Sequence, residues 1–155
     1  MFIFLKNKKL VGFTLVEMLI VISISAILAA SALPIYGNLQ GKGQLNETAA
    51  QIIQGLRSAR GQSLSRYNNA PHGVKFNPNQ YMIYQGTSSA ARDPQYDQTF
   101  NLPTVLVITT NLINDEVNFS AGRGLPNTTG TIVLSQANSG VRTISINSLG
   151  LIEQQ

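Results

Sequence analysis

The chain of 155 residues contains no cysteine, a single histidine and few charged residues. The absence of cysteine excludes thiol catalysis, disulfide bonds and cysteine-ligated zinc. His72 has no carboxylate close to it in the sequence and so offers no metal-ligand spacing, and we expect it at the surface or in a hairpin. Charged residues make up only 12% of the chain, whereas about a quarter is typical of soluble domains.

Recognised catalytic motifs are also missing. The chain has no Gly-x-Ser-x-Gly elbow and no phosphate-binding glycine loop. A Ser-His-Asp triad remains open, because triads assemble in space rather than in sequence. Four acidic residues could offer oxygen ligands to calcium, but they do not fit the EF-hand loop, and solvation of loops is the favoured interpretation: Asp93, Asp97, Asp115 and Glu116. We therefore expect neither an enzyme nor a bound cofactor or metal.

The net charge of +4 is concentrated at the N-terminus. Lys6, Lys8 and Lys9 supply three of the eleven cations, and from Phe13 onward the remaining eight face seven acidic residues, a net charge of +1. Three arginines that lie close together in the sequence could form a basic stripe that contacts DNA: Arg57, Arg60 and Arg66. The low charge and a C-terminal tail without cations argue against DNA binding and favour solvated helix-end charges.

The N-terminus has three blocks: a short leader with lysines over residues 1–12, a junction at Gly12–Phe13, and a stretch without any charge over residues 18–41. A helix of roughly 20 apolar residues spans about 30 Å, the thickness of a bilayer core. The lysines before it favour a cytoplasmic leader, which places the rest of the chain outside the cytoplasm.

Glu17 lies at the start of this apolar segment, where a carboxylate is expensive and usually functional. No cation is found three or four residues away on the same helix face. Its partner must come from another molecule or from the chain's own N-terminus. Cleavage between Gly12 and Phe13 would create an amine one helical turn before Glu17, and in a filament that amine could pair with a neighbour's glutamate.

Two simpler interpretations compete. An ordinary secretory signal would be cut after the A-x-A sequence at residues 30–32, and a plain single-span anchor would not be cut at all. Neither explains a glutamate inside the apolar segment. Glu17 therefore separates a polymerising subunit from a membrane-anchored or secreted binding domain that does not polymerise, which is our alternative hypothesis.

The sequence Gly12-Phe13-Thr14-Leu15-Val16-Glu17-Met18-Leu19-Ile20-Val21 resembles the signal of type IV prepilins and type II secretion pseudopilins. The resemblance implies that prepilin peptidase cuts after Gly12 and N-methylates Phe13, and that Glu17, the fifth mature residue, directs assembly. Pro34 falls where many pilins have a helix-kinking proline. The segment 56–64 and short motifs after residue 116 resemble the GspH/FimT-like minor pilins and pseudopilins.

A second helix pattern follows the apolar segment. Pro34 should kink the helix, and Gly37, Gly41 and Gly43 weaken it, since each glycine costs up to about 1 kcal/mol in a helix interior. From residue 45 an apolar stripe recurs at helical spacing, with Leu64 near its end: Leu45, Ala49, Ile52, Ile53, Leu56 and Ala59. This pattern predicts an amphipathic helix that lies on a sheet.

After residue 70 the pattern alternates. It predicts a hairpin with its turn at residues 77–79, a long exposed loop over 86–103, and strands at 105–109, 116–119, 131–134 and 141–146, the last two joined by a turn at 138–140. The predicted fold class is α+β, a long N-terminal helix packed on an antiparallel β domain. Its predicted divisions are a cleaved leader (1–12), a transmembrane or filament-core helix (13–43) and a globular pilin domain (44–155).

The resemblance implies a structural subunit, minor rather than major, of a type IV pilus or a type II secretion pseudopilus. Its expected partners are other pilin or pseudopilin subunits, prepilin peptidase, the inner-membrane assembly platform and, before assembly, the membrane itself. The expected location is the bacterial inner membrane, with a single membrane pass and the C-terminal domain outside the cytoplasm, followed by a periplasmic or cell-surface filament.

Overall fold

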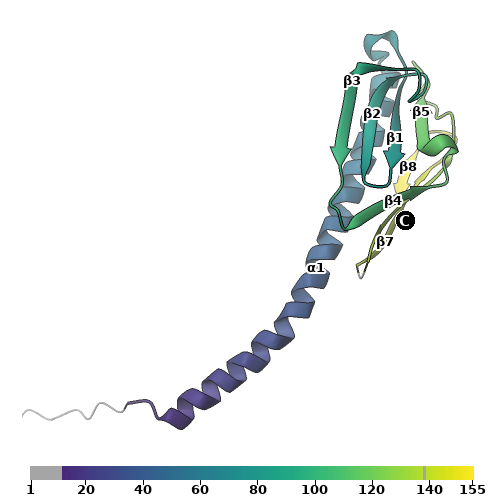
Figure 1. The fold of residues 1–155 in the computed structure, drawn as a ribbon. Helices are drawn as coiled ribbons and strands as arrows, with labels where there is room; N and C mark the ends of the chain where they lie inside the picture. Colours follow the sequence, from purple (N-terminus) through teal and green to yellow (C-terminus); the bar gives the residue numbers. More distant parts are fainter. Residues whose placement is uncertain (1–11, 138) are drawn as a thin grey trace, which may run out of the picture. The chain divides into compact units, whose positions relative to one another are not determined.

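The computed structural model describes residues 12–137 and 139–155, and the side chains of residues 31–36 and 38 lie outside the description (Figure 1). The chain divides into two compact units, residues 1–37 and 38–155. The described residues form the helix α1 (Leu15–Leu64), the 3-10 helices η1 (Tyr67–Asn69) and η2 (Ile113–Asp115), and eight strands: β1 (His72–Asn77), β2 (Gln80–Gly86), β3 (Arg92–Asn101), β4 (Leu106–Thr110), β5 (Glu116–Phe119), β6 (Gly130–Gln136), β7 (Gly140–Ile146) and β8 (Ile152–Gln154).

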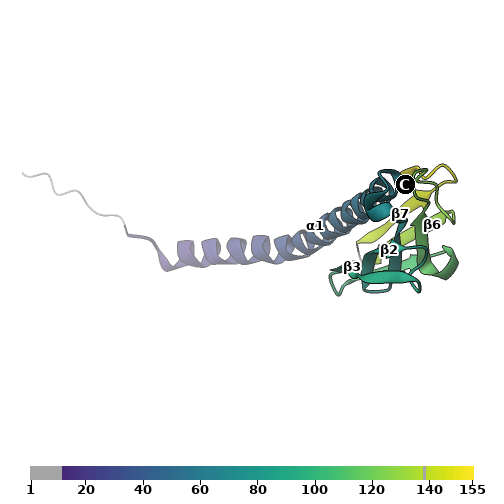
Figure 2. The same cartoon turned by 90° about the horizontal axis from the view of Figure 1, so that it is seen from above.

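The strands form two four-stranded sheets, ordered β3-β2-β1-β5 and β4-β6-β7-β8. Every neighbouring pair is antiparallel. One backbone bond joins the β1–β2 turn to the second sheet, since the amide of Ile108 on β4 donates to the carbonyl of Pro78 at 3.0 Å. Within this unit the C-terminal part of α1 runs beside the strands in both views (Figures 1 and 2). The fold is thus α+β, as predicted.

The predicted apolar stripe of the helix forms part of the core. Leu45, Ala49, Ile52, Leu56 and Ala59 are fully buried, and Ile53 packs against them. They share one cluster with side chains from both sheets, among them Val74, Phe76, Tyr81, Ile83, Val117, Phe119, Ile132, Leu134 and Ile144. Leu64, near the end of the stripe, is 45% exposed and is the last residue of the helix.

The helix continues through its glycines. Residues 34–43 are helical throughout, although glycine weakens a helix interior. Gly41 is buried, and a Cβ there would collide with the Ser139 side chain in the β6–β7 turn. Gly41 therefore lets α1 approach the sheet closely. The side chain of Pro34 lies outside the described residues, and the kink stays a prediction.

The hairpin and the positions of most strands were predicted well, with one clear error. β1 and β2 pair from His72↔Gln85 to Asn77↔Gln80 around the predicted turn. The segment predicted as a loop over 86–103 instead contains β3, which pairs with β2 at the sheet edge. Only one side chain of β3 is even half-buried, so the segment lacks the alternation of apolar and polar residues that marks a strand. Pro94 is tolerated because a strand at the edge of a sheet has backbone positions that need no amide donor. The short strand β8 was not predicted, and Asn138 of the predicted 138–140 turn lies outside the described residues.

Candidate functional site

The helix α1 starts at a side-chain cap. Thr14 precedes the first helical residue, and its Oγ1 accepts a hydrogen bond from the amide of Glu17 at 3.2 Å. The backbone carbonyl of Thr14 accepts a hydrogen bond from the amide of Met18, also at 3.2 Å. Thr14 is therefore the N-cap and Glu17 the third helical residue, the arrangement of the Thr-x-x-Glu capping box. The sequence analysis did not identify Thr14, although this spacing is visible in the sequence.

Glu17 lies in the first turn of α1. A negative charge is favoured there because the unpaired amides at a helix N-terminus carry partial positive charge. Its side chain is exposed, and no ion pair to it is found among the described residues. Glu17 is thus held close to the start of the helix and remains available to a group from outside.

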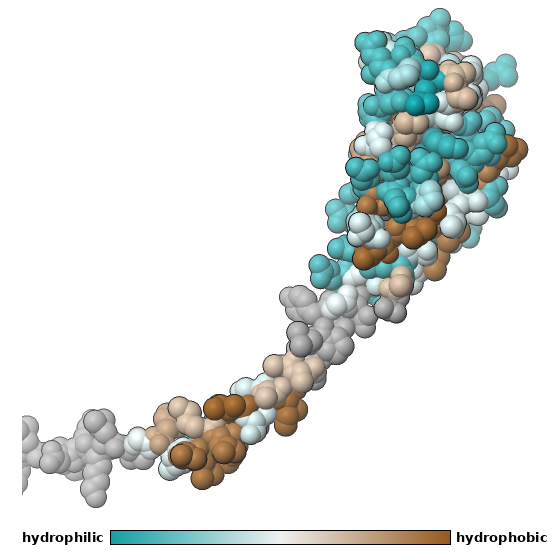
Figure 3. Space-filling view, in the orientation of Figure 1, coloured by the Kyte–Doolittle hydropathy of each residue, from teal (hydrophilic) through white to brown (hydrophobic). Residues whose placement is uncertain are grey.

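Apolar side chains surround this carboxylate and face solvent. Phe13 is 75% exposed, Leu15 81% and Val16 65%, and the exposed surface continues along the helix through Met18, Leu19, Ile20, Val21, Ile22, Ile24, Ile27 and Leu28 (Figure 3). The hydroxyls of Ser23 and Ser25 donate to the carbonyls of Leu19 and Val21, each at 2.7 Å, so these polar groups are satisfied within the helix. A continuous apolar surface of this kind marks a site of association.

Gly12 and Phe13 lie before the helix in exposed, non-helical backbone. A Cβ added at Gly12 would meet no described atom within 4 Å. Among the described residues, none covers the junction of the two residues. The predicted leader, apart from Gly12, lies outside the described residues. In the part of the chain whose side chains are described, no helix is both long and apolar enough to cross a bilayer.

His72 is not at the surface. It begins β1, is 3% exposed, and pairs with Gln85 on β2 and Phe119 on β5. Burial lowers its pKa from the ordinary value of 6.5, and interactions with the Ala70 backbone and the Gln85 side chain oppose that shift. The ring is therefore neutral at pH 7. A neutral imidazole can accept a hydrogen bond, but its Nδ1 has no partner among the described residues.

The three arginines considered for DNA binding do not form one free stripe. Arg60 donates from Nε to the carbonyl of Gly124 at 3.2 Å and from a terminal nitrogen to that of Leu149 at 3.0 Å. It therefore ties α1 to two C-terminal loops, and the expectation that it is a solvated charge was wrong. The four acidic residues considered for calcium do not meet at one point, since the described residues hold no cluster of three metal-ligating side chains.

Two protein-family models match the chain. A model described as a prokaryotic N-terminal methylation motif matches residues 12–33, and one described as type II transport protein GspH matches residues 48–150, more than half of the chain. The first match covers the cap, Glu17 and the exposed apolar surface of α1. The second covers most of the core and every strand except β8.

Solved structures share the fold. The type IV minor pilin FimU of Pseudomonas aeruginosa aligns with a TM-score of 0.59 and 17% identity, over 73% of this chain and 89% of that chain. The minor pseudopilin EpsH from the type 2 secretion system of Vibrio cholerae aligns with a TM-score of 0.57 and 11% identity, over 72% and 96%. At these identities the likeness concerns the fold alone. The family resemblance seen in the sequence is confirmed: the chain belongs to the GspH family of type II transport proteins and carries a prokaryotic N-terminal methylation motif from Gly12 onward.

Proposed function

We propose that this protein is a minor structural subunit of a type IV pilus or of a type II secretion pseudopilus, and that it polymerises through the N-terminal part of α1. The observation that carries the proposal is the exposed apolar surface of α1, which begins at a capped first turn holding Glu17. A subunit that packs its helix against other helices would bury this surface.

The proposal includes a processing step. Cleavage between Gly12 and Phe13 by prepilin peptidase would release an amine, which the same enzyme would methylate. Both residues precede the helix in exposed backbone, as a substrate for a peptidase requires. Before cleavage the precursor would be anchored in the bacterial inner membrane, with its C-terminal domain outside the cytoplasm, and it would then join a filament through the assembly platform and other pilin subunits.

Glu17 would give assembly its register. The new amine would lie one turn before Glu17 along the chain, and a neighbouring subunit would present the same pair. A carboxylate in apolar surroundings is strongly disfavoured without a partner, so pairing Glu17 with the amine of Phe13 from a neighbour would favour one axial offset between helices. The Thr14 cap supports this role, because it holds Glu17 in the first turn.

Mass spectrometry of the protein recovered from membranes and filaments tests the processing step. The proposal predicts an N-terminal methylated Phe13, and it predicts that Gly12→Ala slows cleavage more than Lys6→Ala does, because the peptidase needs a small residue before the cut. A mature N-terminus at Leu33 would indicate an ordinary secretory signal. An intact leader on a stably folded membrane protein would support the non-polymerising alternative.

A further inference from the structure

The sheet edge at β3 carries a large bulge. Ile83 on β2 pairs with Gln98, and Gln85 pairs with Asp93, so four residues of β3, numbers 94–97, face the single residue Tyr84. Extra residues in one strand bend it and redirect its side chains, and such bulges are frequent beside functional sites.

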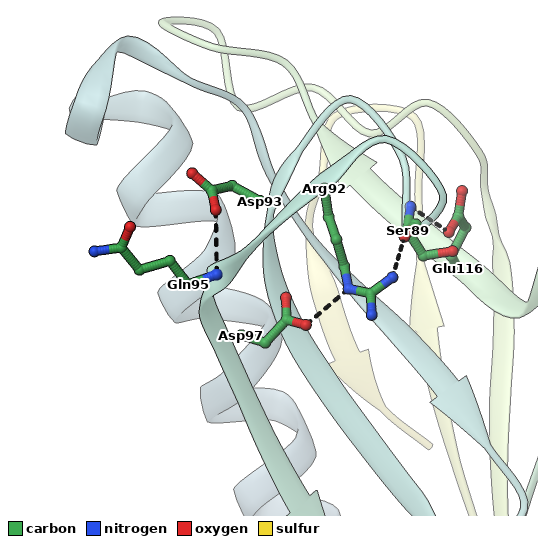
Figure 4. Close-up of polar contacts among 6 residues, drawn as sticks. All are labelled: Ser89, Arg92, Asp93, Gln95, Asp97 and Glu116. Atoms are coloured by element: carbon green, nitrogen blue, oxygen red, sulfur yellow. Dashed lines mark hydrogen bonds and ion pairs between the residues drawn. The ribbon is translucent and has the colours of Figure 1, made fainter.

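Polar contacts fix the shape of this bulge (Figure 4). At its start, the amide of Gln95 donates to Oδ1 of Asp93 at 3.1 Å. At its end, Oδ2 of Asp97 accepts from Nε of Arg92 at 2.7 Å, and Arg92 also donates to the carbonyl of Ser89 at 2.6 Å. The ion pair spans the bulge from one side to the other. The extra residues are thus held in one arrangement.

A cavity of about 230 Å³ lies beneath the bulge. It is lined by Tyr96 and Asp97 from the bulge, by Tyr84 and His72 from the strands below, and by Tyr67 from η1, together with Gln62, Ile83, Gln95 and Gln98. The rings of Tyr67 and His72 lie 5.9 Å apart at 46°. The space is several times the volume of one water molecule, which is about 30 Å³ in the liquid.

Two lining residues have buried polar atoms without a partner among the described residues: Oδ1 of Asp97 and Nδ1 of His72. Asp97 uses its other oxygen for Arg92, and His72 is 3% exposed. An unpaired buried acceptor costs roughly 1–3 kcal/mol, so Oδ1 of Asp97 favours a hydrogen-bond donor in the cavity.

The charged and aromatic residues that line the cavity indicate which kind of hydrogen-bond donor it would bind. Among the described residues that line the cavity, Asp97 is the only one charged at neutral pH. Arg92, outside the lining, already pairs with its Oδ2, so the free Oδ1 is what favours a donor in the cavity. Three tyrosines line the same space, and the face of an aromatic ring attracts cations. A group with several N–H donors and a positive charge satisfies both features. We propose that this cavity binds a primary ammonium group.

A free alkylamine and a lysine side chain both carry this group. The test uses the processed full-length chain in detergent at pH 7.5, and the signal of His72, the single histidine, reports on the cavity. Its ring resonance is followed by NMR during titration with butylammonium, with butan-1-ol as a neutral control of the same shape, and with Nα-acetyl-lysine N-methylamide. Tighter binding of the lysine derivative would identify a protein side chain as the source, and tighter binding of butylammonium a free amine.

The proposal predicts a saturable shift with butylammonium and none with butanol. Asp97→Asn should weaken binding at least tenfold, whereas Glu153→Gln, which removes an exposed negative charge on β8, should not. Tyr96→Phe keeps the ring and should retain binding, and Tyr96→Leu should weaken it, which provides a test that leaves the Arg92–Asp97 pair intact. Equal shifts with butanol, the absence of a saturable shift, or unchanged affinity in both Asp97→Asn and Tyr96→Leu would overturn the proposal.

Discussion

Ser63 and His72 exchange two hydrogen bonds where the helix meets the sheet. The amide of His72 donates to Oγ of Ser63 at 2.8 Å, and that hydroxyl donates to the carbonyl of His72 at 3.3 Å. Both residues are buried. One side chain of α1 thus satisfies the first backbone groups of β1 and fixes the position of the hairpin against the helix.

The first prediction concerns this pair. Ser63→Ala should lower the free energy of unfolding by roughly 1–3 kcal/mol, because it removes two hydrogen bonds between buried residues. Urea unfolding of the full-length chain measures the change. Ser65→Ala is the control, since the Ser65 hydroxyl is exposed and bonds only to a carbonyl of its own helix end. Equal stability of the two variants would contradict this role of Ser63.

The second prediction concerns the close approach of Gly73 to Tyr84, its partner across the strands. A Cβ at Gly73 would lie 2.5 Å from the Tyr84 hydroxyl oxygen and 2.7 Å from the carbonyl of Val117. Tyr84 is fully buried, and burial raises its pKa to about 12. Gly73→Ala should therefore cost about 1–3 kcal/mol through overpacking.

Gly43 provides the matched comparison for Gly73. It lies in α1, is exposed, and has no described atom within 4 Å of an added Cβ. Gly43→Ala should stabilise the chain by up to about 1 kcal/mol, because alanine favours the helix. The same urea experiment measures both variants. A stabilising Gly73→Ala would show that the strands separate more easily than the packing suggests.

The third prediction concerns pH. Burial lowers the pKa of His72 in the folded chain below 6.5, the value expected when the chain is unfolded. Below pH 6.5 the unfolded chain binds a proton that the folded chain excludes, so the contribution of His72 to stability is complete above this pH and falls as the pH decreases. The unfolding midpoint should therefore decrease from pH 7.5 to pH 5.5 more in the parent than in His72→Gln. If the unfolding midpoints of the parent and of His72→Gln decreased equally with pH, this role of His72 would be contradicted.

The sequence predicted the helix, its buried face and most strands, because these segments have clear apolar periodicity. The strand β3 was missed because its side chains are exposed on both sides and it contains Pro94. The bulge could not be predicted, since it depends on the pairing of β3 with β2. The burial of His72 was missed for a similar reason: the position lies between two strands, and one of them, β5, is more than forty residues away.

At the start of the helix, by contrast, the sequence itself carries the signal. Gly12, Phe13 and Glu17 were identified from their order in the sequence, and the roles assigned to them remain predictions. Thr14 was overlooked, although Thr-x-x-Glu before an apolar run is a known sign of a helix start. The hydrogen bond from the Glu17 amide to Thr14 explains how a carboxylate is positioned so close to the proposed cleavage site.

The account rests on Glu17, and its most direct test compares filament incorporation of Glu17→Leu and Glu17→Gln with that of the parent, beside the amount of processed subunit in the membrane. Glu47→Gln is the control, because it removes an exposed charge from the same helix. We predict that both Glu17 variants are processed and retained in the membrane but enter filaments at a small fraction of the parent's level, while Glu47→Gln assembles normally. Incorporation of Glu17→Leu at the parent's level would contradict the proposed role of the carboxylate in assembly.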